Sequence, residues 1–349
     1  MSGAQNTTED TKVMGAGILP ASHWQSLPVD NPDDDDKSLR SQSMVSSTTS
    51  LRESILQYRK LFGRTYHHEY GDAESWIPND EKHRECMELG HYIVLLLQDN
   101  KLFYSPLDTD KIKRVVDIGT GTGIWAMDFA DQYPHVEVTG TDITPIQPTW
   151  TPPNLTFELD DANQEWTWPD NTFDFVYVRF LNGCIRDWEK FYRQAYRCLK
   201  PGGWLEHHEV ALEWKSDTQE IPPHSPIGQL IQLFTSAGEK IGRTFRTVDD
   251  CLQKPAMEAA GFVDLQEKYL KCPLGDWPTD PQQKQVGLLM NEALLGDLEG
   301  YTIYVYTAIM GWKEEEARAM IAHLRAHFRK PGLNPYIPRR VVWGRKPEV

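Results

Sequence analysis

The sequence has few of the residues that build disulfide frameworks, zinc sites or nucleic-acid-binding surfaces. Its 349 residues include five cysteines, which are widely separated and form no C-x-x-C pair. This spacing indicates free thiols and favours neither a disulfide framework nor a zinc site. Lys and Arg together number 36 against 51 Asp and Glu, and the net charge of −15 argues against general affinity for nucleic acid. We therefore expect no bound metal and no direct nucleic-acid partner.

Long apolar runs and a secretory leader are also missing. The longest apolar run, Tyr92 to Leu97, is far shorter than the ~20 residues of a bilayer-spanning helix. The first residues do not combine a basic region with a following apolar region, so they do not resemble a signal peptide. We expect a cytoplasmic protein without membrane contact, with the nucleus left open as a location.

The chain is divided into three segments that differ in composition and pattern. Residues 1–50 are rich in Ser, Thr, Asp and Pro and show no apolar periodicity, which predicts a disordered acidic tail. Residues 51–110 contain helical apolar patterns and are predicted to form an N-terminal helical cover. Residues 111–349 alternate between strand and helix patterns, as expected of one α/β domain.

Two helices are predicted in the N-terminal cover. The first begins near Leu51 and ends near Gly63, because apolar residues recur there at helical spacing. The second follows Asn79, a suitable N-cap, with Asp80 and Glu81 in its first turn.

Strands and helices then alternate in the pattern of a doubly wound α/β fold, in which helices cover both faces of a mainly parallel sheet. Strands are predicted at 114–118, 136–142, 155–162, 173–180 and 202–212, and helices at 123–133 and 188–199. Beyond 216 we predict helices at 225–242, 247–261, 281–298 and 313–329, and strands at 261–275 and 339–347. Residues 221–300 interrupt the sheet pattern and are predicted to form a helical lid over an acceptor site.

A glycine-rich turn between the first strand and its helix is the strongest local signal. Gly119, Gly121 and Gly123 allow a bound ligand to approach the backbone at a helix N-terminus. The NAD fingerprint G-x-G-x-x-G is not met, because Ile124 stands where its third glycine belongs. No G-K-[ST] follows the turn, which excludes a P-loop.

An acid, Asp117, directly precedes this turn on the strand. A carboxylate there would repel a pyrophosphate, whereas the sulfonium and amino group of S-adenosylmethionine (SAM) would be attracted. With its D-x-G-x-G-x-G form, the stretch resembles the first motif of the class I SAM-dependent methyltransferases. That resemblance implies a Rossmann-like sheet of seven strands with SAM as the cofactor.

The later motifs extend the resemblance in the same order and spacing. It implies that Asp142, at the end of a strand, accepts hydrogen bonds from the ribose hydroxyls of SAM, with Ile143 beside it. Asp161 and Ala162 match the position that contacts the adenine. The predicted cofactor-binding residues are Asp117, Gly119, Thr120, Gly121, Gly123, Asp142, Ile143, Asp161, Ala162 and Arg179.

Further segments, including "GIWAMDFADQYP", "LKPGGWLEHHE" and the terminal "WGRKP", resemble the LaeA-like fungal methyltransferases from Leu51 to Val349. In that family some members methylate small molecules in biosynthetic clusters, and others regulate secondary metabolism from the nucleus with velvet-type partners. The motifs are shared by both kinds. We expect methyl transfer to a small-molecule acceptor, with the regulator and a velvet-type protein partner as the alternative.

Methyl transfer needs a general base only when the acceptor must lose a proton. His207 and His208 lie on the fifth predicted strand, where alternation allows only one of them to face the pocket. Tyr66 and His67 precede the second helix and are the other weak candidates. Arg179 is suited to binding a substrate or cofactor carboxylate. A structural interpretation stays open for each, because histidines, tyrosines and arginines also pack or pair with local acids.

Overall fold

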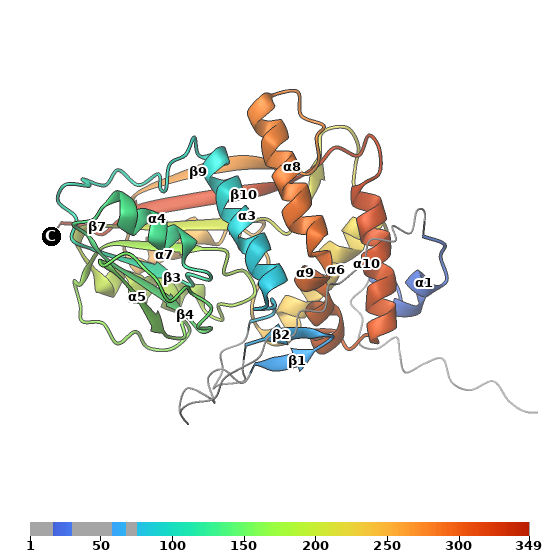
Figure 1. The fold of residues 1–349 in the computed structure, drawn as a ribbon, viewed down its shortest axis with the longest axis horizontal. Helices are drawn as coiled ribbons and strands as arrows, with labels where there is room; N and C mark the ends of the chain where they lie inside the picture. Colours follow the sequence, from blue (N-terminus) through green and yellow to red (C-terminus); the bar gives the residue numbers. More distant parts are fainter. Residues whose placement is uncertain (1–16, 30–57, 68–74, 349) are drawn as a thin grey trace, which may run out of the picture.

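The protein is described by a computed structural model that covers residues 17–29, 58–67 and 75–348. Most of the predicted acidic tail and the first turns of the helix predicted from Leu51 lie outside these residues. Figure 1 shows a sheet covered by helices on one side of the molecule and a helical layer on the other, with α3 between them.

The central sheet follows the strand order β5, β4, β3, β6, β7, β10 and β8, and β9 pairs with β10. β3 to β7 run parallel to one another, and β10 runs antiparallel to β7 and β9. The strands are β3 (Arg114–Ile118), β4 (Glu137–Asp142), β5 (Leu155–Leu159), β6 (Phe173–Arg179), β7 (Leu199–Val210), β8 (Lys215–Ser216), β9 (Val263–Pro273) and β10 (Pro335–Arg345). The seven predicted strands are confirmed, and the two-residue β8 is an addition.

Helices cover both faces of this sheet, which confirms the doubly wound fold. Side chains alternate along each strand, so Val116 and Val176 pack with α5 (Trp188–Cys198) and α7 (Gln253–Ala260). Val115 and Phe175 pack on the opposite face, with α4 (Ile124–Gln132).

A separate helical layer contains the largest apolar core. It consists of α6 (Pro226–Ile241), α8 (Pro281–Gly296), α9 (Leu298–Tyr304), the π-helix η2 (Val305–Ile309) and α10 (Glu314–Phe328). α3 (Glu81–Leu97) packs along α8 and joins this layer to the sheet, as Figure 1 shows. Asp80, one residue later than predicted, caps α3 by accepting a hydrogen bond from the backbone N–H of His83.

The prediction of a helix that ends near Gly63 is wrong for residues 58–63, the part of this segment that the structure describes. Arg59–Leu61 and Arg64–Tyr66 instead form a hairpin, β1 and β2. Phe62 and Gly63 make its tight turn with positive φ angles of 55° and 74°. The helical spacing of the apolar residues was outweighed by this turn and by tertiary contacts of Arg64.

Part of the predicted tail is also ordered. Residues 17–29 contain the short helix α1 (Ala21–Gln25), in which Trp24 is only 2% exposed. Trp24 packs against His323 of α10, whose Nε2 lies 2.9 Å from the Trp24 carbonyl oxygen. A single tryptophan that packs against another element produces no periodic apolar pattern. This contact therefore could not be predicted from the polar composition of the segment.

Within the described residues, no helix is long and apolar enough to cross a membrane. The same part of the chain contains no cluster of three or more His, Cys, Asp and Glu residues that would suit a metal ion.

Candidate functional site

A cavity of about 380 Å³ lies between the carboxyl ends of the parallel strands and the helical layer. Its volume falls in the range of ~300–1,000 Å³ that is typical of small-molecule pockets. One end is lined by predicted cofactor residues: Gly119, Thr120, Gly121, Asp142, Ile143, Asp161, Ala162 and Arg179. The other end is apolar and includes Trp76, Leu230, Phe234, Phe245, Leu294 and Phe328.

The glycine turn joins β3 to α4 and cannot accept side chains. Gly119, Gly121 and Gly123 have φ angles of 71°, 59° and 80°, which are strained for other residues. A Cβ on Gly119 would lie 2.5 Å from a methyl of Leu181, and one on Gly123 would lie 2.3 Å from the Phe157 ring. The turn therefore presents bare backbone to the cavity, with Gly123 directly before the first residue of α4.

Asp117 supports the turn from beneath and does not line the cavity. The Thr120 hydroxyl donates a hydrogen bond of 2.6 Å to its carboxylate, and the residue is 3% exposed. Burial raises the pKa of Asp117 to about 6, although the hydrogen bond and the charge of Arg179 oppose the shift. The residue thus holds the shape of the turn, and its negative charge reaches the cavity only through space.

Asp142 lies at the carboxyl end of β4, next to the glycine turn. Its carboxylate accepts hydrogen bonds from the backbone N–H groups of Gly121 and Thr144, at 2.8 and 2.9 Å. Burial raises its pKa to about 6 in spite of these bonds. Because Asp142 also lines the cavity, its carboxylate is placed to accept further hydrogen bonds from a ligand.

The loop after β5 forms the next wall of the cavity. The Asp161 carboxylate accepts hydrogen bonds of 3.0 Å from the backbone and side-chain nitrogens of Asn163, which fixes the loop. Ile143, Asp161 and Ala162 all line the cavity close to Asp142. This part of the structure places the residues predicted for ribose and adenine contacts in one wall.

Arg179, at the end of β6, is held by a histidine and has no carboxylate within ion-pair distance among the described residues. Its Nη1 lies 3.2 Å from Nδ1 of His91, and Nε2 of His91 lies 2.8 Å from the Asp128 carboxylate. Burial and the neighbouring guanidinium lower the pKa of His91, which favours a neutral ring that accepts from Arg179. Arg179 therefore has donors left for an anion in the cavity.

The two histidines of β7 lie outside the cavity lining. Alternation does place His207 with Glu209, 3.2 Å apart, and His208 with Glu206, 2.7 Å apart. The other nitrogen of His207 contacts the Tyr192 hydroxyl at 2.7 Å, so both ring nitrogens have buried partners. Only Glu209 of these side chains lines the cavity, so neither histidine is placed to act as a base there.

Tyr66 and His67 also lie behind the cavity wall. Tyr66 is fully buried and packs against the Tyr304 ring at a centroid distance of 5.1 Å. His67 lies 3.3 Å from the Thr144 hydroxyl, two residues beyond Asp142. Neither lines the cavity. His67 thus acts on the cofactor end only through the Asp142 loop.

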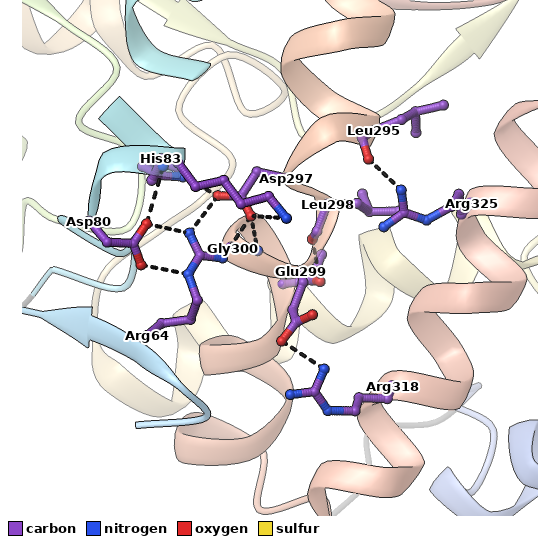
Figure 2. A network of polar contacts seen from close by, with 12 residues as sticks. Arg64, Asp80, His83, Leu295, Asp297, Leu298, Glu299, Gly300, Arg318 and Arg325 are labelled. Atoms are coloured by element: carbon purple, nitrogen blue, oxygen red, sulfur yellow. Dashed lines mark hydrogen bonds and ion pairs between the residues drawn. The ribbon is translucent and has the colours of Figure 1, made fainter. Parts of the chain in front are cut away.

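Sequence reasoning missed a histidine and an aspartate at the apolar end. His83 of α3 lines the cavity, and its Nδ1 donates to the Asp297 carboxylate at 2.9 Å. Figure 2 shows Arg64 between Asp80 and Asp297, donating to both carboxylates. Burial alone would raise the pKa of Asp297, but His83 and Arg64 lower it to about 2.

The charged Asp297 fixes the tautomer of His83, so that Nε2 is left as the accepting nitrogen. Nε2 has no hydrogen-bond partner among the described residues. The available signal was a histidine on the buried face of a helix that otherwise carries Cys86, Ile93 and Leu97. That signal did not reveal Asp297, which is 214 positions away in the sequence.

The predicted lid segment supplies much of the apolar end. Phe234 of α6, Leu294 of α8 and Leu298 of α9 line the cavity. The wall is nevertheless wider than predicted, because Trp76 before α3 and Phe328 of α10 also contribute to it.

Comparison with known proteins gives the family. Residues 89–239 match the family described as "Methyltransferase domain". Methyltransferase pytC of Aspergillus terreus is 34% identical over 303 residues, which cover 86% of this chain and 92% of that protein. The secondary metabolism regulator LAE1 of Cochliobolus heterostrophus is 31% identical over 295 residues, which cover 82% and 94%.

Solved methyltransferase structures are more distant. Phosphoethanolamine N-methyltransferase 2 of Haemonchus contortus, in complex with S-adenosyl-L-methionine, is 17% identical with a TM-score of 0.44, over 74% of this chain and 52% of that chain. The YcgJ protein of a Bacillus species is 17% identical with a TM-score of 0.41, over 74% and 100%. The strand order, the glycine turn with its acids and the similarity to pytC and LAE1 together identify the chain as a member of the LaeA-like class I methyltransferases, enzymes that use SAM as methyl donor.

Proposed function

We propose that the protein transfers the methyl group of SAM to a small-molecule acceptor of fungal secondary metabolism. The observation that carries this proposal is the cavity described above, in which the glycine turn and Asp142 border an apolar compartment. Similarity to pytC over most of both chains supports a biosynthetic role. The compartment has the size and apolar lining of a small-molecule pocket.

The residues at the polar end fit SAM by their chemistry. The glycine turn offers backbone without side chains, because Cβ atoms at Gly119 and Gly123 would collide with Leu181 and Phe157, and Asp142 offers a half-buried carboxylate for the ribose hydroxyls. Asp161 and Ala162 would contact the adenine. Arg179, which has donors left, would bind the carboxylate of the methionine part.

When bound, SAM supplies an electrophilic methyl group on a sulfonium sulfur. The chain contributes mainly orientation, which is worth ~7–11 kcal/mol when two reactants are held in line. The apolar side chains of Phe234, Phe245 and Leu294 exclude water from the acceptor compartment. The orientation of the acceptor is then set by the polar side chains around it. No covalent bond to the protein is required.

His83 is the residue we propose as general base for an acceptor that must lose a proton. Asp297 orients the ring through Nδ1, and Nε2 takes the proton while the acceptor oxygen or nitrogen attacks the methyl carbon. Bound SAM would supply the methyl group, and His83 would hold the proton that the acceptor gives up. Tyr301, which packs edge-on against His83 at 4.9 Å, limits the positions of the ring.

The test is incubation of the purified protein with SAM carrying a labelled methyl group and an extract of a producing strain. Protein and extractable metabolites are then separated. We expect label in one or a few low-molecular-weight compounds, and less of it when Asp142→Ala replaces the wild type at a low SAM concentration. Label found only on protein would contradict the small-molecule proposal.

The regulator remains a second candidate because LAE1 is similar over 94% of its own length. In that case a protein partner would cover the cavity or receive the methyl group. The family resemblance implies a partner of velvet type. The same experiment separates the two functions, since the regulator predicts label on a protein or no label in metabolites.

A further inference from the structure

A buried arginine lines the apolar end of the cavity without an anionic partner. Arg339, on β10, is 6% exposed and borders the cavity. Its Nε and Nη1 atoms have no hydrogen-bond partner among the described residues, and its sulfur neighbours are Met290, 4.0 Å from Nη2, and the Cys272 thiol. No carboxylate of the described residues lies within ion-pair distance of it.

The neighbours of Arg339 hold it in place and supply no negative charge. The Phe180 ring at the end of β6 lies 5.1 Å from its guanidinium carbon, and Phe180 has a positive φ of 61°. Burial raises the pKa of the Cys272 thiol on β9, and Arg339 offsets only part of this shift. Burial likewise raises the pKa of Tyr301 on α9 above its usual value. Both groups are therefore neutral near pH 7.

A buried charge without a partner is costly, and proteins rarely keep one without a use. The next residue provides the contrast. Arg340 points to the other face of β10, where Glu267 accepts a hydrogen bond of 2.8 Å from its Nε. One arginine of the pair is thus neutralised by the protein, and the other faces the compartment in which the acceptor is expected.

We propose that Arg339 binds an anionic group of the methyl acceptor, so that the acceptor is an apolar acid. This inference rests on the proposed function of the cavity. A guanidinium recognises carboxylates and phosphates through paired N–H donors, while the apolar lining accepts the rest of the molecule. Arg179, whose guanidinium carbon lies 5.3 Å from the same Phe180 ring, is the arginine that we assign to the cofactor.

The experiment uses the full chain with and without S-adenosylhomocysteine (SAH) and three probes: benzoate, phenyl phosphate and the neutral benzamide. Binding is measured by calorimetry for the wild type, Arg339→Met, Arg339→Lys and the matched control Arg340→Met. We expect benzoate to bind the wild type and Arg340→Met, to bind Arg339→Met about tenfold more weakly or not at all, and to bind Arg339→Lys at an intermediate level. Benzamide should not bind. A preference for phenyl phosphate over benzoate would assign the anion to a phosphate ester.

Thermal unfolding without ligand provides a second readout. Because Arg339 carries a desolvated charge, Arg339→Met should unfold at the same or a higher temperature than the wild type, whereas a purely structural arginine would lower it. Equal binding of benzoate and benzamide, unchanged benzoate binding in Arg339→Met, or no binding of either anion to the wild type would overturn the proposal. SAH titration is read separately, so a failed cofactor assignment would be distinguished from a failed acceptor assignment.

Discussion

The backbone N–H of Gly121 donates a 2.8 Å hydrogen bond to the carboxylate of Asp142. This bond joins the glycine turn after β3 to the end of β4, the two elements that the sequence motifs assign to the cofactor. Thr144 donates to the same carboxylate from the following loop. Asp142 is therefore fixed in position before any ligand enters, and its chemistry can be tested directly.

Replacement of Asp142 should weaken cofactor binding. Asp142→Ala removes the acceptor proposed for the ribose hydroxyls, and we expect SAH affinity to fall by ~1–3 kcal/mol. Calorimetric titration measures the change. Asp131→Asn is the matched control, because Asp131 is an exposed acid on α4 outside the cavity lining. Equal affinity in a folded Asp142→Ala variant would contradict the ribose assignment.

Cofactor affinity should depend on pH. Burial raises the pKa of both Asp142 and Asp117 to about 6. Ligand hydroxyl groups donate to the ionised carboxylate, so affinity for SAH should be full above pH 7 and decline as pH falls through 6. At Asp117 and Asp142 the folded chain binds more protons than the unfolded chain. These two carboxyl groups should therefore contribute more to the stability of the unliganded protein as pH falls from 7 towards 4.

Titration of SAH at several pH values between 5 and 8 checks this dependence. Asp142→Asn cannot ionise at that position, and its affinity should be lower but flatter with pH. An identical pH dependence in wild type and Asp142→Asn would mean that Asp142 does not control binding.

The glycine turn should tolerate no Cβ at Gly119. Gly119→Ala combines a left-handed φ, at about 1–2 kcal/mol, with overpacking against Leu181, at about 1–3 kcal/mol. Gly63→Ala is the matched control, because Gly63 also has a positive φ but has open space around it. Denaturant unfolding should show the larger loss for Gly119→Ala, together with reduced SAH binding. Equal losses would show that the close contact is relieved without cost.

Replacement of His83 should slow turnover while leaving cofactor binding intact. His83→Gln keeps a donor for Asp297 but removes the base. We expect kcat to fall ~10²–10⁴-fold with the acceptor that the labelling experiment identifies. His135→Gln, an exposed histidine outside the cavity, is the control. If His83→Gln keeps the wild-type rate, the acceptor loses its proton without help from this residue.

The sequence predicted the parallel sheet, its helices and a group of residues that line one end of the cavity, because each depends on local patterns. Asp117, the three glycines and Asp142 lie within one β-turn-α-β unit, and strand order then brings Asp161 and Arg179 to the same edge. The sequence did not predict side-chain partners that lie far apart in the chain.

The polar groups of the acceptor end illustrate why. His83 meets Asp297 only through tertiary packing of α3 against α8, at whose C-terminal end Asp297 lies. His207 and His208 stand on a promising strand, but their nitrogens are taken by buried neighbours that no local pattern reveals. For Arg339 and Arg340 the alternation of a strand places one side chain on each face, yet only the structure shows that Arg340 has an acidic partner and Arg339 has none.

The most direct test of this account is a crystal structure of the full chain with SAH. It should show both ribose hydroxyls within hydrogen-bond distance of the Asp142 carboxylate, the adenine against Asp161 and Ala162, and the sulfur facing the compartment of Phe234 and Phe245. SAH bound elsewhere, or with its ribose away from Asp142, would contradict the account.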